Sequence, residues 1–138
     1  MVQDADSELI VQVLTTPGNV PDGVVLPTLA QPQAKELTGD KAYDSKANRS
    51  HLATLGVASG LYPRLPRPGR PRKSWRERPQ IKRNFAECKQ LHGLRRARYW
   101  GLAKVTVQTL MVALVVNLKR WVTLLKLRSP PFSWPNVA

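Results

Sequence analysis

Basic residues are concentrated in the middle of this chain, at spacings suited to binding phosphate groups. Residues 64–98 contain thirteen Lys and Arg residues against two acidic residues. Within them, Arg78, Lys82 and Lys89 are four and seven residues apart. Such positions share one face of a helix, so these cations are expected to point the same way. A polyanion-binding face is one interpretation, and an ordinary solvated basic face is the other.

The charge of the whole chain favours a nucleic-acid partner. Among 138 residues, 22 Lys and Arg outnumber 9 Asp and Glu, which gives a net charge of +13. Such an excess is typical of proteins that bind nucleic acid. Residues 1–63, however, hold four basic and seven acidic residues. The binding surface is therefore predicted in the second half of the chain.

Cysteine and histidine usage excludes several other functions. Cys88 is the single cysteine, so the chain can form no internal disulfide and no cysteine-based zinc cluster. His51 and His92 are the only histidines, which makes a His/Cys metal site a poor interpretation. The N-terminus, MVQDADSE, is acidic rather than basic and does not resemble a secretory signal. A cytoplasmic location is expected.

Two segments are predicted to contact nucleic acid. Residues 63–73 (PRLPRPGRPRK) are rich in Pro and Arg, which predicts an extended loop whose arginines contact phosphate, although a plain linker is the alternative. Residues 95–100 interleave cations with Tyr99 and Trp100, which suits phosphate contact and base stacking. A helix corner with the aromatic rings packed inward explains this second segment equally well. The candidate contacts are Arg64, Arg67, Arg70, Arg72, Lys73, Arg95, Arg96 and Arg98.

Hydrophobic periodicity predicts an α/β fold. Strands are expected at residues 9–16, 36–40 and 57–62, together forming one small sheet, with a helix near residues 45–55. A helix at 79–91 should bury a face made of Ile81, Phe85, Cys88 and Leu91. A long helix should span residues 101–127. Its most apolar part, residues 105–118, is shorter than a membrane span needs, so a buried core helix is predicted.

Four blocks of sequence give these elements a family context. TTPGNVPD, GDKAYDSKANRSHLATLG, IKRNFAECKQLHGLRRARYWGLAKVTVQTL and NLKRW resemble, in this order, the insertion-sequence transposases of the DDE class. The resemblance implies a ribonuclease H-like fold. It also implies three carboxylates that hold two Mg²⁺ ions for phosphoryl transfer on DNA.

The resemblance assigns roles to individual residues. Asp40, in GDKAYDS, matches the second catalytic acid and would be a metal ligand. Lys82 occupies the position of the catalytic Glu, where a cation would repel Mg²⁺. Arg78 and Lys89 match family residues that would contact DNA phosphate, and Trp75 replaces a tyrosine.

No other acid readily replaces the missing ligands. Glu77 and Glu87 each lie five residues from Lys82, about 140° around a helix, and Glu87 is expected to pair with Arg83 instead. The family's first catalytic Asp would lie upstream of the matching segment, and Asp4 and Asp6 match a strand connection. The fold is therefore expected to be an incomplete ribonuclease H-like one, with a small mixed sheet, flanking helices and a long C-terminal helix.

The predicted organisation is one domain with a Pro/Arg-rich loop. Residues 1–63 form the part carrying Asp40, residues 64–74 the loop, residues 75–127 the helices and residues 128–138 a loose tail. The leading hypothesis is a transposase fragment that binds DNA, pairs with itself or with another transposase chain, and does not cut DNA alone. The alternative is a small basic nucleic-acid-binding protein without enzymatic ancestry. A membrane-associated protein is the least favoured class.

Overall fold

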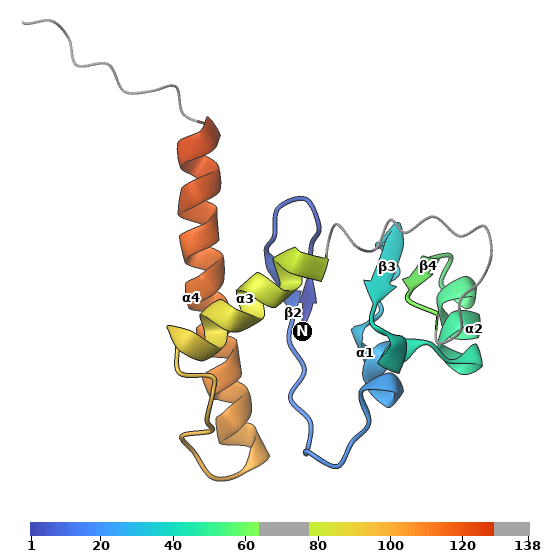
Figure 1. The fold of residues 1–138 in the computed structure, drawn as a ribbon, viewed down its shortest axis with the longest axis horizontal. Helices are drawn as coiled ribbons and strands as arrows, with labels where there is room; N and C mark the ends of the chain where they lie inside the picture. The colour runs from blue at the N-terminus through green and yellow to red at the C-terminus, as the bar shows by residue number, and fades with distance from the viewer. Residues whose placement is uncertain (64–77, 129–138) are drawn as a thin grey trace, which may run out of the picture.

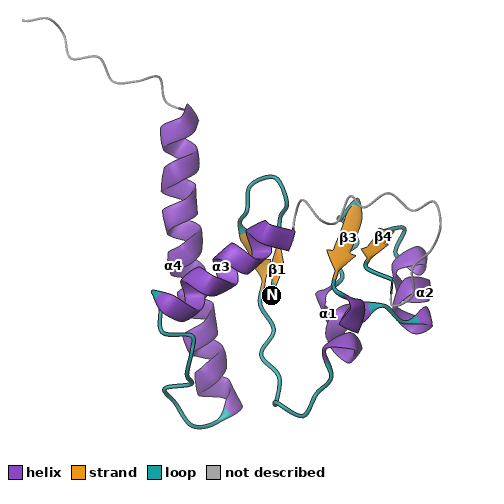
Figure 2. Cartoon of the chain, viewed as in Figure 1, coloured by secondary structure: helices purple, strands orange, loops and turns teal. Residues whose placement is uncertain are grey.

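The computed structural model describes residues 1–63 and 78–128, and it confirms a mixed α/β protein (Figures 1 and 2). The Pro/Arg-rich loop predicted at residues 64–74 and the predicted C-terminal tail lie outside the described residues, apart from Arg128. In chain order the elements are β1 (Val2–Gln3), β2 (Ile10–Gln12), the 3₁₀ turn η1 (Asp22–Val25), α1 (Leu26–Leu29), β3 (Glu36–Gly39), the 3₁₀ turn η2 (Lys41–Tyr43), α2 (Lys46–Thr54), β4 (Ala58–Leu61), α3 (Arg78–Gln90) and α4 (Leu102–Arg128).

The strands form two separate sheets, so the prediction of one sheet is wrong. β1 and β2 make an antiparallel hairpin, whereas β3 and β4 pair in parallel from Glu36 opposite Ala58 to Gly39 opposite Leu61. The reason lies at Ile10 in β2. Its N–H and C=O both bond the side-chain amide of Asn117 on α4, at 2.8 Å each, so a helix side chain takes the place of a further strand.

A first hydrophobic core joins the N-terminal hairpin to the two long helices. It contains Ile10 from β2, Cys88 from α3, and Val112, Ala113 and Val116 from α4. Cys88 is 1% exposed, which confirms it as a small core residue. In Figure 1 the hairpin lies beside α3 and α4, although most of the sequence separates them.

A second core lies around the parallel strands. Leu26, Leu52, Val57 and Leu61 form it, with Leu52 fully buried on the inner face of α2. The helix α2 begins at Ser45, whose hydroxyl accepts a hydrogen bond from the Asn48 N–H at 3.1 Å. This unit fixes the end of β3, and therefore the position of Asp40.

The buried face of α3 differs from the predicted one. Cys88 is buried as expected, and Ile81 is half-buried, but Phe85 is 37% exposed and Leu91 is exposed. Asn84 takes a buried position instead and donates to the Glu8 carbonyl at 3.2 Å. This side of α3 faces the hairpin turn, where the Glu8 carbonyl accepts the Asn84 hydrogen bond.

The prediction of a buried α4 is wrong for most of its surface. One face, carrying Gln108, Val112, Ala113 and Val116, is buried, whereas many other apolar side chains of the helix are exposed. By length and composition, Leu102–Lys126 could also cross a membrane, with a mean hydropathy of 1.4, contrary to the shorter apolar run expected. A single helix of this kind is weak support for a membrane span.

Candidate nucleic-acid interface

Asp40 follows directly after β3 and is exposed. Its carboxylate accepts a hydrogen bond from the Lys41 N–H at 2.7 Å and so begins the turn η2. Asp44, four residues later, is buried and pairs with Arg49 at 2.5 Å. The two acids of the GDKAYDS block therefore have different surroundings, and Asp40 is the one open to solvent.

Lys82 lies on α3, in the unit built around Cys88, whereas Asp40 belongs to the unit built around Leu52. Figure 1 shows β3 and α3 in these different parts of the molecule. Across residues 1–63 and 78–128, no three His, Cys, Asp or Glu side chains come together in a way that could hold a metal ion. The described residues therefore do not fit a two-Mg²⁺ centre.

Glu87 does not pair with Arg83, contrary to the prediction. Its carboxylate bonds Lys119 of α4 and lies 3.4 Å from His92 Nε2. The hydrogen bond from Lys119 is the main reason that the pKa of Glu87 is lowered, and the His92 contact adds to it. Glu87 thus ties α3 to α4 and is not available as a substitute metal ligand.

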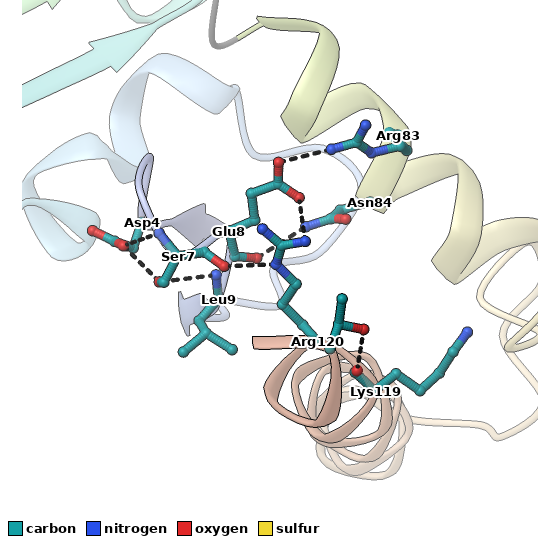
Figure 3. A network of polar contacts seen from close by, with 9 residues as sticks. Asp4, Ser7, Glu8, Leu9, Arg83, Asn84, Lys119 and Arg120 are labelled. Carbon is teal, nitrogen blue, oxygen red and sulfur yellow. Dashed lines mark hydrogen bonds and ion pairs between the residues drawn. The ribbon is translucent and has the colours of Figure 1, made fainter. Parts of the chain in front are cut away.

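Arg83 pairs instead with Glu8, at the turn of the N-terminal hairpin (Figure 3). The Arg83 guanidinium lies 2.8 Å from one Glu8 oxygen, and Arg120 of α4 lies 3.6 Å from the other. Arg120 also donates to the Ser7 carbonyl at 2.8 Å. Arg83 and Arg120 therefore hold the hairpin in place, and sequence spacing alone gave no signal of these contacts.

The exposed basic surface lies between α3 and α4. Gly93, just after the end of α3, has a φ of +70°, a conformation that favours glycine. A Cβ at this position would lie 2.8 Å from the Arg98 guanidinium. Arg95, Arg96 and Arg98 are exposed in the segment that follows. We call residues 91–101 the basic loop.

Aromatic residues of the basic loop face solvent. Tyr99 is 54% exposed and Trp100 is 94% exposed, so the alternative in which these rings pack inward is wrong. Lys89, at the end of α3, is exposed as well. Beside the loop, an open groove of about 370 Å³ is lined by Arg98 and Tyr99 and by Val107 and Met111 of α4.

Gln108 fixes the basic loop onto α4. Its side-chain oxygen accepts from the Arg98 N–H at 3.0 Å, and its NH₂ group donates to the carbonyls of Gly93 at 3.3 Å and Arg96 at 3.2 Å. Gln108 is itself buried. Its only sequence signal is a polar residue inside an apolar helix, and the same holds for Asn117.

The other predicted contacts cannot all be placed. Lys82 and Lys89 lie on the exposed side of α3, as expected for a shared face. The backbone of Arg78 begins α3. Trp75 and Glu77 lie outside the described residues. So do five of the candidate phosphate contacts: Arg64, Arg67, Arg70, Arg72 and Lys73.

Comparison with known proteins identifies the family. A family model described as "Transposase DDE domain" matches residues 67–122, which include α3, the basic loop and most of α4. The "Transposase for insertion sequence element IS1106" of Neisseria meningitidis serogroup B is 31% identical over 122 residues. The chain belongs to the insertion-sequence DDE transposases. The alignment covers 75% of this chain and 39% of the transposase relative. No solved structure matches significantly.

Proposed function

We propose that this transposase chain acts in DNA transposition as a DNA-binding part of the catalytic domain, and that it is inactive in catalysis on its own. The observation that carries the proposal is the basic loop. It presents three arginines and two exposed aromatic rings, and it lies within the segment that matches the DDE domain. Such a surface suits the phosphate backbone and the faces of bases.

The binding chemistry follows from the side chains. Arg95 and Arg96 present guanidinium groups that can each make two parallel hydrogen bonds to one phosphate. Tyr99 and Trp100 offer ring faces to any base. Neither kind of contact distinguishes one sequence from another. The chain is therefore proposed to bind DNA with little sequence preference, at an affinity that falls with salt.

The proposal of inactivity rests on the acids. In the family, Mg²⁺ ions would activate the attacking oxygen and stabilise the leaving one. Asp40 offers one carboxylate, and the position of the family's catalytic Glu carries a cation, Lys82. These residues do not supply the ligands that a two-metal step requires. A complete site would require acids supplied by another segment or another chain.

We also propose an incomplete ribonuclease H-like fold. Its support is the parallel pair β3 and β4 joined across α2, with Asp40 at the end of the first strand and two helices later in the chain. The proposed location is the cytoplasm, with the protein on the bacterial chromosome. The proposed partner is DNA rather than a membrane.

Fluorescence anisotropy with a labelled duplex tests the binding site. The double variant Arg95→Ala/Arg96→Ala should bind clearly more weakly than the unmodified chain, by about tenfold or more if each phosphate contact contributes about 1 kcal/mol. The control is Lys35→Ala/Lys46→Ala, which removes two exposed cations from the other unit. An equal loss in both variants would show that total charge, not the basic loop, determines binding.

A further inference from the structure

The outer face of α4 carries an apolar stripe with a regular spacing. Val107, Met111, Leu114, Leu118 and Trp121 follow one another at intervals of four, three, four and three residues. They are between 49% and 59% exposed. The 4–3 repeat is the spacing by which one helix packs along another helix. We call these five residues the α4 seam.

The seam lies opposite the packed face of the helix. At 100° per residue, its members lie within about 40° of one direction, whereas the buried residues Gln108, Val112, Ala113 and Val116 lie about 100° to 240° from it, centred about 165° away. The hairpin, α3 and the basic loop contact the second direction. In Figure 1 the upper half of α4 rises beyond the other described elements. Nothing among the described residues therefore blocks the approach of a partner to the seam.

We propose that the α4 seam pairs with the seam of a second copy of this chain, antiparallel and with Leu114 on the two-fold axis. Leu114 is seven residues from both Val107 and Trp121, so the two helices would match end for end. Met111 would then lie near Leu118 of the second copy. Such a symmetric interface uses the same patch on both chains.

Shape supports the antiparallel match. The pairing sets the large ring of Trp121 against the small side chain of Val107 in the second copy. Val107 lines the open groove beside the basic loop, together with Met111 and Tyr99. The indole would thus enter a hollow of about 370 Å³. A large group opposite a small one is how helix layers interdigitate.

Charge supports it as well, despite the net charge of +13. The seam carries no charged residue, and the nearby Lys119 and Arg120 already pair with Glu87 and Glu8. A parallel pair would bring the two basic loops together. The antiparallel pair separates the Leu102 ends by about 36 Å along the helices, at 1.5 Å per residue, well beyond the roughly 8 Å range of like-charge repulsion in physiological salt.

The size of the contact predicts a weak, reversible dimer. The seam and its apolar neighbours Leu110, Val115 and Val122 are roughly half exposed. Together they offer on the order of 500 Å² per chain, so a symmetric pair would bury about 1,000 Å², the lower limit for a specific interface. Where the proposed DNA binding also holds, the 36 Å separation matches one turn of B-DNA, which would let both basic loops contact one face of a duplex.

Sedimentation velocity between about 1 and 100 µM tests the pairing, since a contact of this size is expected to form in that range. The unmodified chain should shift from monomer to dimer. Leu114→Asp should stay monomeric with unchanged helix content by circular dichroism. Val24→Asp, at an exposed apolar position outside the seam, should still dimerise. A chain that stays monomeric throughout, or a Leu114→Asp variant that still dimerises, would overturn the proposal.

Cysteine cross-linking tests the direction of the helices. Leu114→Cys should form a covalent dimer on oxidation, while the buried Cys88 of the unmodified chain should not. Val107→Cys should link to Trp121→Cys in a mixture but not to itself. Self-linking of Val107→Cys would overturn the antiparallel match.

Co-sedimentation of the chain with neutral phosphatidylcholine vesicles would overturn the proposed pairing, because lipid would then cover the seam. A chain that binds DNA but stays monomeric up to about 100 µM would refute the pairing alone, and a dimer that does not bind DNA would refute the proposed function alone.

Discussion

Replacing Gln108 with leucine should loosen the basic loop without leaving a cavity in the hydrophobic core. The change removes one acceptor, for the Arg98 N–H, and two donated bonds, to the carbonyls of Gly93 and Arg96. Leucine has a similar size and a high helix propensity, so α4 itself should persist. The loop would then lose the contacts that hold its backbone to the helix.

The size of the effect can be worked from the three bonds. Neutral hydrogen bonds contribute roughly 0.5–1.5 kcal/mol each, and two of these three are long, at 3.2 and 3.3 Å. Gln108→Leu should therefore lower the free energy of unfolding by about 2 kcal/mol. DNA binding should weaken at least tenfold, because binding would have to order a loop that is now mobile, and fixing even one residue costs about 1–2 kcal/mol.

Urea unfolding and duplex anisotropy measure the two effects on the same samples. Thr109→Ala is the matched control, because the Thr109 hydroxyl bonds only the Val105 carbonyl of its own helix. Its free energy of unfolding should stay within about 0.5 kcal/mol of the unmodified value. If Gln108→Leu kept full stability and full DNA affinity, the idea that Gln108 organises the interface would be refuted.

Three further changes test the rest of the structure. Asn117→Ala should cost about 2–3 kcal/mol in urea unfolding, because both backbone groups of Ile10 lose their bonds. The pKa of Glu87 is lowered from its ordinary value of 4.5. The ionised carboxylate therefore stabilises the fold above that pH, and this stabilisation is lost as the pH falls through the folded pKa. Glu87→Gln should flatten the acid side of a plot of unfolding free energy against pH. The Lys82→Glu variant should show no Mg²⁺-dependent nicking of plasmid DNA. Nicking by this variant that is lost when Asp40→Ala is added would contradict the proposed inactivity.

Local sequence patterns predicted most elements, although the strand expected at residues 9–16 is confined to Ile10–Gln12 and its partner β1 was not predicted. The helices α3 and α4 begin and end within about one residue of the predicted bounds, and β3 and β4 lie inside their predicted ranges. Helical periodicity, Gly93 and the cap at Ser45 are signals carried by neighbouring residues, so they can be recognised without tertiary structure. The α/β class followed from these elements.

The arrangement of the elements could not be predicted in the same way. That Asn117 would take the place of a strand beside Ile10 depends on two residues 107 positions apart. The pairing of Arg83 with Glu8, rather than with Glu87 four residues away, likewise requires the hairpin to reach α3. Burial of α4 was overestimated because hydrophobicity does not show which of two apolar faces finds a partner. For the basic loop, the sequence pointed to its arginines and aromatic residues, and the structure shows them exposed, but Gln108 was recognised only from the structure.

The salt dependence of duplex binding tests directly whether the basic loop is the DNA interface of this transposase chain. Each phosphate contact contributes a slope of about −0.9 to a plot of log affinity against log salt concentration. Replacing Arg95, Arg96 and Arg98 together with alanine should reduce the magnitude of the slope by about 3. An unchanged slope in this triple variant, or no binding by the unmodified chain at low salt, would contradict the account.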